Sequence, residues 1–291
     1  MILKSDERRK SYQKEYELKR EYRMKKSIKL LATLATVFAI VTLAACGASK
    51  EDSSKSATDN IKAKGKIVIG VKQDVPNFGY KDPKTNKFTG VEIDLANKIA
   101  KDLGVKAEFV PITAQTRGPL LDNKQVDAVI GTFTITPERQ KTYNFTTSYF
   151  TDEVGFLVNK ASDFKSVDDL DGKTIGVAQS ASTKNALEAL GKEKGFSFKY
   201  SELADYPTLK TALTSGRIDA FSVDKSILSG YVDAKTEIMG EGFASQEYGI
   251  ATKKSNTELA DYLDKQVKTL KSNGELKKMT DKYNLKDATA K

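Results

Sequence analysis

Short apolar stretches alternate with amphipathic helical stretches from Gly65 onward, and this rhythm limits the fold more than any other feature of the 291-residue sequence. Val91 and Leu95, for example, belong to a run of apolar residues spaced by four, which is typical of one face of a helix. Helices that alternate with buried strands predict an α/β class with parallel strand neighbours. In this half of the chain, strands are expected at 66–71, 106–110 and 126–130, and a short helix at 117–121.

The same rhythm returns after Val154 and predicts a second lobe of similar construction. A long helical pattern near the C-terminus has no strand after it, so we expect it to pack back on the first lobe; its apolar residues are Leu259, Leu263, Val267 and Leu270. We therefore predict a lobe 1 formed by 64–152 plus 247–291 and a lobe 2 formed by 153–246. Strands of lobe 2 are expected at 173–178, 196–200 and 217–221, and helices near 183–190 and 207–213.

The segment before residue 64 lacks the alternation of strand and helix patterns seen in the rest of the chain. Positions 30–45 are uncharged, but this run is shorter than the roughly 20 residues that a membrane-spanning helix needs. It follows three lysines and ends in small residues directly before Cys46, the single cysteine. This arrangement resembles a bacterial lipoprotein signal peptide with its lipobox. The resemblance implies a signal peptide over 24–45 and a diacylglycerol on the Cys46 thiol, whereas a membrane helix with an incidental cysteine is the alternative.

Two further segments flank this signal peptide. Residues 1–23 carry mixed charge unlike an ordinary signal peptide, and Met24 followed by two lysines offers a conventional start. We interpret 1–23 as an extension upstream of the true start, with a genuine cytoplasmic extension as the alternative. After Cys46, small and charged residues with little to bury predict a flexible tether that ends at 63.

Composition excludes several classes of function. The net charge is +9, but residues 1–46 hold 11 Lys or Arg against 5 Asp or Glu, so the body gives little reason to expect nucleic acid. The absence of histidine excludes histidine triads and histidine metal ligands. One cysteine excludes an intrachain disulfide and a cysteine-rich zinc site. Lys, Tyr and carboxylate catalysis stay open, but we expect a binding protein with no metal and no cofactor.

The loop after the strand at 126–130 has the features of an anion site. Thr136 is expected to cap a helix whose first residue is Pro137. Arg139 then lies in the first turn, where the helix dipole disfavours a cation, and this indicates a bound anion such as a carboxylate. The alternative is a solvated arginine on a surface helix. Ligands of open α/β sheets bind beyond the carboxyl ends of strands, so we expect 132–134 and 222–224 to face each other across a cleft.

Five motifs occur in a fixed order: GVKQDVP at 70–76, TRGPLL at 116–121, TFTITPER at 132–139, GVAQ at 176–179 and AFSVDKS at 220–226. Together they resemble the family 3 solute-binding proteins of polar amino-acid ABC transporters, most of all the aspartate/glutamate-binding members, over about 64–285. The resemblance implies a type II periplasmic-binding fold, with two lobes that close on the ligand and hinge crossings near 152–156 and 245–250. It also implies an ABC permease with its ATPase as partners, and a monomer tethered by lipid to the outer face of the bacterial membrane.

The resemblance also assigns the groups that bind the ligand backbone. Arg139 matches the arginine that binds the α-carboxylate, since a planar guanidinium can bind two oxygens at once. Thr134 matches a hydroxyl that assists it, Thr132 lies in the same motif, and Ser182 or Thr183 matches donors from the second lobe. Asp224 matches the carboxylate that pairs with the α-ammonium. Thr134, Ser182, Thr183 and Asp224 could each instead cap a turn or a helix.

Lys72 and Arg117 are expected to set the ligand preference. With Arg139 against Asp224 they leave two surplus positive charges, which suits glutamate or aspartate better than glutamine. Arg117 could instead serve an amide oxygen and Lys72 could be a surface lysine, so a glutamine-preferring protein is the alternative. Tyr206 is a weaker pocket candidate, with an aromatic on the lobe surface as the alternative. Two alternative functions from other classes are a dehydratase-type enzyme with the same fold and a surface adhesin.

Overall fold

The computed structural model describes residues 56–289, without the side chain of Glu241. The predictions for 1–23, for the signal peptide at 24–45 and for lipidation of Cys46 lie outside these residues. No helix within 56–289 is long and apolar enough to cross a membrane.

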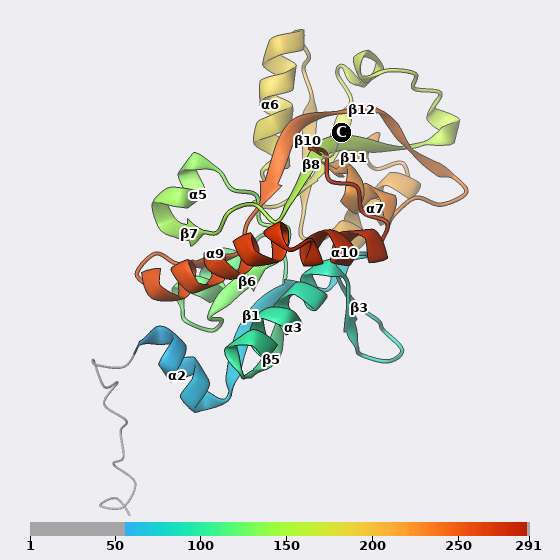
Figure 1. Ribbon diagram of the computed structural model, residues 1–291. Coiled ribbons are helices and arrows are strands. Elements are labelled where there is room, and N and C mark those ends of the chain that lie inside the picture. Colours follow the sequence, from blue (N-terminus) through green and yellow to red (C-terminus); the bar gives the residue numbers. More distant parts are fainter. Residues whose placement is uncertain (1–55, 290–291) are drawn as a thin grey trace, which may run out of the picture. The chain divides into compact units, whose positions relative to one another are not determined.

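The first lobe is built on a five-stranded sheet whose order is β5-β1-β6-β13-β7 (Figure 1). Its interior strand β1 pairs in parallel with β5 on one side and with β6 on the other, as the alternation of strands and helices predicts. The apolar side chains of Ile67, Ile69 and Val71 are fully buried there. The strands are β1 (Lys66–Lys72), β5 (Lys106–Ile112), β6 (Ala128–Ile130), β7 (Tyr143–Phe145) and β13 (Ala251–Lys253), and the helices between them are α3 (Val91–Leu103), α4 (Arg117–Asp122) and α5 (Pro137–Thr142).

A small antiparallel sheet follows β1 in the same lobe. Its strands are β2 (Asp74–Val75), β3 (Gly79–Lys81) and β4 (Phe88–Thr89). This sheet matters for the site because β2 directly continues from the end of β1.

The second lobe is built on a sheet with the order β10-β9-β11-β8-β12. Strand β9 pairs in parallel with β10 and β11, and β8 pairs antiparallel with β11 and β12. The strands are β8 (Phe150–Asn159), β9 (Thr174–Ala178), β10 (Lys199–Leu203), β11 (Ala220–Asp224) and β12 (Thr236–Tyr248), and the helices are α6 (Thr183–Lys194), α7 (Tyr206–Thr214), α8 (Lys225–Ser229) and the short 3-10 turns η1 (Lys160–Ser162) and η2 (Val167–Leu170).

Two expected strands of the second lobe begin three residues later than predicted. Strand β10 starts at Lys199 and not at 196, because the chain is still closing helix α6 there: the Phe196 N–H donates to the Gly191 carbonyl. Strand β11 starts at Ala220 and not at 217, because the Arg217 N–H still donates to the Ala212 carbonyl at the end of α7. Residues whose apolar pattern predicted the start of a strand therefore form hydrogen bonds that end the preceding helix.

The long paired strands β8 and β12 connect the two sheets, since β7 precedes β8 and β13 follows β12. They run side by side in Figure 1. The crossings expected near 152–156 and 245–250 fall on these strands or directly after them. Their pairing register shifts between Met239 and Ser245, so the middle of this ribbon is irregular. The lobe boundaries predicted at 152/153 and 246/247 stay a prediction.

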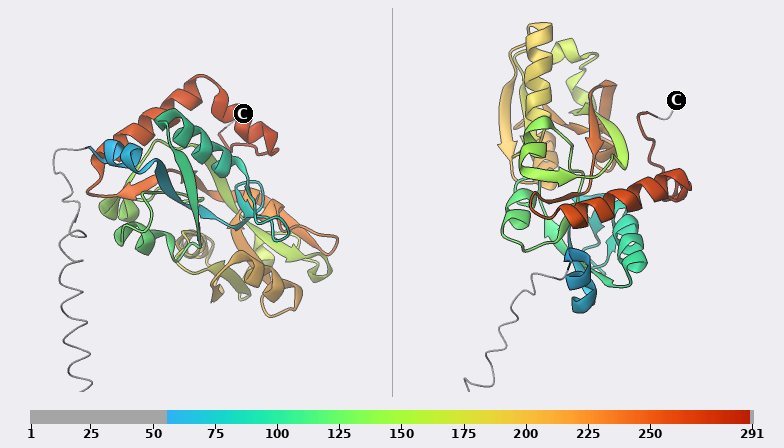
Figure 2. Two further views of the ribbon diagram at one scale, coloured as in Figure 1. Left: turned by 90° about the horizontal axis from the view of Figure 1, so that it is seen from below. Right: turned by 60° about the vertical axis from the view of Figure 1, so that its left-hand side comes forward.

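The expected tether is wrong from residue 57 onward, because α2 (Ala57–Lys64) is a helix (Figure 2). The Ser56 hydroxyl accepts from the Asp59 N–H at 3.1 Å and caps it, and Ile61 is buried. Glu258 of the C-terminal helix also holds it, since the carboxylate accepts from the Thr58 hydroxyl at 2.6 Å. A single apolar residue in a charged sequence gave no helical pattern to detect.

The C-terminal helices pack on the first lobe as expected. Helix α9 (Thr257–Ser272) buries its predicted apolar face and lies against β7 and β13. Helix α10 (Glu275–Lys282) continues along α3, and Figure 2 shows both helices crossing the same lobe.

Candidate functional site

Arg139 lies where the sequence places it, in the first turn of α5. Thr136 caps this helix by accepting from the Arg139 N–H at 3.2 Å, and Pro137 is the first helical residue. The guanidinium donates to the Thr134 carbonyl at 2.8 Å and, across the lobes, to the Ser180 carbonyl at 3.2 Å. Burial and the nearby Arg117 lower the pKa of Arg139 to about 9. A half-buried cation in this position favours an anionic partner.

Two of the hydroxyl groups predicted to bind the ligand, one from each lobe, lie close together. The Thr134 and Ser182 hydroxyl oxygens are 3.0 Å apart, and Ser182 donates to the Gln246 side-chain oxygen at 2.8 Å. Ser182 precedes α6 but makes no side-chain capping bond, so the capping alternative is wrong for it. Thr183 is buried beside it. Gln246 had not been identified from the sequence, because nothing marks an amide on a connecting strand.

Asp224 ends β11 and faces a second buried carboxylate. It makes no side-chain capping bond to α8 and accepts instead from the Tyr248 hydroxyl. Asp152 lies close by and accepts from the Ser226 N–H at 3.0 Å. Burial and the charge of Asp152 raise the pKa of Asp224 to about 7. A carboxylate destabilised in this way is well suited to pair with an ammonium group.

Lys72 and Tyr206 are both inside the protein and not on its surface. Lys72 is 1 % exposed, and its ammonium lies 3.0 Å from an Asp74 carboxylate oxygen and 4.5 Å from the centre of the Tyr206 ring. Tyr206 is 3 % exposed, so the surface alternatives for both residues are wrong. Burial lowers the pKa of Lys72, and Asp74 opposes that shift.

Arg117 is 3 % exposed and supports the loop after β6. Its guanidinium carbon lies over the Phe133 ring, 4.0 Å from the ring centre, and the guanidinium donates to the carbonyls of Gly131 at 3.2 Å and Thr132 at 3.0 Å. Thr132 has a φ of 43°, a left-handed conformation that is unfavourable for threonine and that often marks a functional loop. The Thr132 hydroxyl and the Arg117 Nε have no hydrogen-bond partner among the described residues.

The structure adds Glu92, which had not been identified from the sequence. This residue is in the first turn of α3 and is 0 % exposed. One carboxylate oxygen accepts from the Thr132 N–H at 2.6 Å and from the Tyr149 hydroxyl at 2.5 Å. Burial raises the pKa of Glu92 to about 6. A signal was present: Glu92 precedes Leu95 by three residues, which puts a charge on the apolar face of the helix.

The surplus of two positive charges inferred from the sequence is wrong. Three further carboxylates lie among the predicted cations or beside Asp224: those of Glu92 and Asp152, which are buried, and that of Asp74, whose side chain is 10 % exposed. Asp74 pairs directly with Lys72, and Glu92 interacts electrostatically with both Lys72 and Arg117. With Asp224 there are four carboxylates near the three cations Lys72, Arg117 and Arg139, so no positive surplus remains.

The lobes also meet beside these charges, at a contact that we call the rim contact and define as Asp74 and Pro76 against Gly230 and Tyr231. The Tyr231 hydroxyl donates to the Asp74 carbonyl. A methyl group built on Gly230 would lie 2.8 Å from both Cβ and Cγ of Pro76, which is too close for carbon atoms. Only a glycine therefore permits this approach of the lobes.

We predict that Gly230→Ala weakens ligand affinity by about tenfold, because an overpacked contact costs roughly 1–3 kcal/mol and this one exists only when the lobes meet. Calorimetric titration measures the loss. Ser229→Ala, at the exposed neighbouring residue, is the control and leaves affinity unchanged. Equal affinity of Gly230→Ala and the unaltered protein would show that the rim contact does not limit closure.

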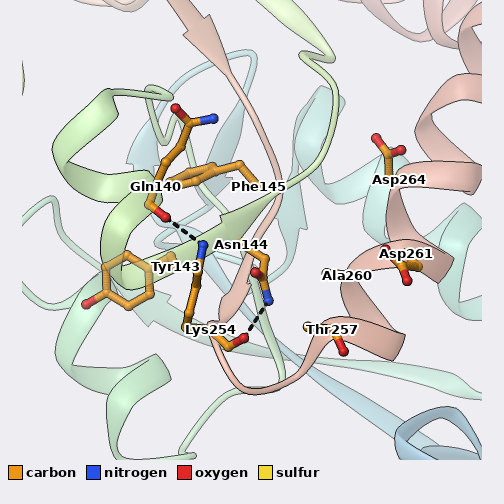
Figure 3. A pocket seen from close by; sticks show the side chains of 9 residues that line it. All are labelled: Gln140, Tyr143, Asn144, Phe145, Lys254, Thr257, Ala260, Asp261 and Asp264. Atoms are coloured by element: carbon orange, nitrogen blue, oxygen red, sulfur yellow. Dashed lines mark hydrogen bonds between the residues drawn. The ribbon is translucent and has the colours of Figure 1, made fainter.

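A separate hollow of about 280 Å³ lies between α5, β7 and α9 (Figure 3). Its polar groups already bond to one another: Lys254 donates to the Gln140 carbonyl at 2.7 Å, and the Asn144 amide donates to the Lys254 carbonyl at 3.1 Å. Within 56–289 there is also no group of His, Cys, Asp and Glu side chains that could hold a metal ion. The interlobe residues form the candidate site.

Residues 67–286 match the family model of bacterial extracellular solute-binding proteins, family 3. The chain belongs to this family. The resemblance to the solute-binding proteins of amino-acid ABC transporters is thereby confirmed, and so is the two-lobed type II fold, which solved relatives share.

This family 3 solute-binding protein is similar to curated proteins over most of its length. It is 39 % identical to the ABC transporter glutamine-binding protein GlnH of Bacillus subtilis, covering 83 % of this chain and 91 % of that one. It is 34 % identical to the glutamine-binding protein of Geobacillus stearothermophilus, covering 78 % and 93 %. Among solved structures, the P235GK mutant of ArgBP from T. maritima superimposes with a TM-score of 0.71 at 30 % identity, covering 78 % and 99 %.

Proposed function

We propose that this protein binds glutamine between its lobes and delivers it to the permease and ATPase of an ABC importer. The charge balance of the site carries this proposal. Lys72 is paired with Asp74, and the Glu92 carboxylate interacts electrostatically with both Lys72 and Arg117. A ligand whose own side chain is neutral leaves this balance intact, whereas a second carboxylate on the ligand would add an unmatched buried charge, which is costly.

In the proposed complex, the two lobes bind the two charged groups of the amino acid. Arg139 binds the α-carboxylate through its planar guanidinium, assisted by the hydroxyls of Thr134 and Ser182. Thr132 and Thr183 complete this side as donors. Asp224 binds the α-ammonium, because a carboxylate with a raised pKa gains from a cationic partner.

The ligand side chain is then left to Lys72, Arg117 and Tyr206. The amide oxygen accepts from one of the cations, while the Tyr206 ring covers the aliphatic part. Because Arg139 and Asp224 come from different lobes, a ligand bound to both stabilises the closed form relative to the open one.

The sequence alone favoured glutamate or aspartate, and the balance of buried charge is what moves the proposal to glutamine. Two relatives named as glutamine-binding, at 39 % and 34 % identity, support the same choice. The acidic ligands are the alternative outcome of the test.

We also propose that the protein is a monomer anchored outside the cytoplasm. The family is described as extracellular, which supports an external location. The anchor is a lipid on Cys46 after removal of 24–45, and the lobes divide as 64–152 plus 247–291 and 153–246. The protein is not an enzyme in this proposal, so glutamine recovered unchanged after incubation is expected. Detection of a converted product would instead favour the dehydratase reading.

Calorimetric titration of the purified protein with glutamine, glutamate, asparagine and aspartate tests the ligand. Co-purified ligand is removed first, since a bound ligand raises apparent stability and masks the site. Tight binding of glutamine with weak binding of both acids is expected. Preference for glutamate or aspartate would overturn the charge argument, and binding of none would overturn the receptor assignment and leave the adhesin reading.

A further inference from the structure

The buried carboxylate of Glu92 contacts three separate parts of the first lobe. Glu92 lies in the first turn of α3. Its Oε1 accepts from the Thr132 N–H in the loop after β6, and the same oxygen accepts from the Tyr149 hydroxyl at the crossing before β8. Thr132 in turn accepts from Arg117 through its carbonyl. Glu92 is therefore connected to Arg117 through Thr132, which forms a hydrogen bond with each of them.

The second oxygen of Glu92 has no hydrogen-bond partner among residues 56–289. The charged or titratable groups that interact with this carboxylate are Lys72 from β1, Arg117 from α4, Tyr149 from the crossing segment and Tyr206 from α7 of the second lobe. A buried charge is tolerated when opposite charges lie near, and here the two cations are the same residues that surround the ligand side chain in the proposed complex.

We propose that Glu92 is the residue that makes the site select an amide over a carboxylate side chain. This inference rests on the proposed glutamine-binding function. As an anion, Glu92 offsets the cations that a ligand carboxylate would otherwise use and repels that carboxylate. As a neutral group, it leaves a positive charge free, and glutamate becomes the better ligand.

The pH dependence of selectivity follows from the pKa of about 6 that burial gives Glu92. Above this pH the carboxylate is ionised and glutamine is favoured. Below it Glu92 takes up a proton, more readily in the glutamate complex than in the glutamine complex, so the preference shifts toward glutamate as pH falls. Asp224 and Asp152 also titrate, but they face the α-ammonium, which both ligands share, so their effect cancels in the affinity ratio.

The first test needs no substitution. The ratio of glutamine to glutamate affinity is measured calorimetrically on the unaltered protein from about pH 7.5 to about pH 5, and we expect it to fall by about tenfold. A constant ratio would overturn the inference while leaving glutamine binding, and hence the proposed function, intact. Failure of glutamine to bind at any pH would overturn the proposed function and this inference with it.

The second test is Glu92→Gln, which keeps an oxygen acceptor for Thr132 and Tyr149 and removes the charge. We expect its affinity ratio to shift toward glutamate by about tenfold or more at neutral pH and to lose its pH dependence. Glu108→Gln, on the exposed surface of β5 beside Lys66, is the matched control and keeps the original ratio and its pH dependence. A purely structural role for Glu92 would weaken both ligands equally in the variant, and that result would also overturn the inference.

Discussion

Replacement of Arg139 by alanine is expected to weaken amino-acid binding by at least about a hundredfold. In the proposed complex the guanidinium is the partner of the ligand α-carboxylate, and loss of one member of a buried charged pair costs roughly 3–5 kcal/mol. The residue also donates to the Ser180 carbonyl of the second lobe, so the variant loses a direct link between the lobes as well. Calorimetric titration with glutamine measures the effect.

Two companion variants make this result specific. Arg139→Lys keeps the charge but not the planar fork, and we expect it to recover only part of the affinity. Arg217→Ala removes an exposed arginine of the second lobe, whose Nε donates to Ser215, and it should bind normally. Normal binding by Arg139→Ala would refute the assignment of the α-carboxylate to this residue.

The second large effect is expected from Asp224→Asn, which should lower affinity for glutamine by roughly a hundredfold. The amide cannot neutralise the α-ammonium, which would then be buried without a counter-charge. The Tyr248 hydroxyl can still donate to the amide oxygen, so the fold around the site should persist. Unchanged thermal unfolding would separate lost binding from lost structure.

Asp224 should also make the affinity of the unaltered protein for glutamine depend on pH, and the raised pKa determines the direction. Its pKa is about 7 without an ammonium beside it, and the ligand should lower that value. Affinity for glutamine is therefore complete above about pH 7 and declines as pH falls below it, by at most about tenfold per pH unit. Asp224→Asn should remove most of this dependence, leaving only the part due to Asp152, whereas Asp281→Asn, in an exposed pair with Lys277, should retain it in full. A declining affinity that persists in full in Asp224→Asn would assign the titration to another group.

Much of the fold could be predicted because its determinants are local in sequence. The cap of Thr136 and Pro137 specifies the start of α5 within one turn, and the spacing of Leu259 and Leu263 specifies the buried face of α9. Strand β10 was misplaced because aromatic residues that follow Gly195 have high strand propensity but serve the helix end. Helix α2 was missed because its stability comes from Glu258, about 200 residues away.

The structure brings predicted residues of both lobes together, as in the contact of Thr134 with Ser182, but the charge balance around them could not be predicted from the sequence. Motifs at the ends of strands identify Arg139 and Asp224, because strand ends are where such folds bind ligands. Whether Lys72 is a free cation or half of an ion pair depends on where Asp74 points, and that is set by the packing of β2 against β3 and the second lobe. Glu92 and Lys72 are separated by 20 positions but interact electrostatically in the folded protein, so no local pattern relates them.

The chain contains no tryptophan, and several of its tyrosines lie where the two lobes touch. Tyr206 packs under the Lys72 ammonium, and Tyr231 donates to the Asp74 carbonyl at the rim contact. Separation of the lobes would expose both phenols to water and remove the charge next to one of them. Tyrosine emission, normally masked by indole, should therefore report opening and closing directly, so that ligand exchange can be followed in real time by stopped-flow fluorescence without an attached dye.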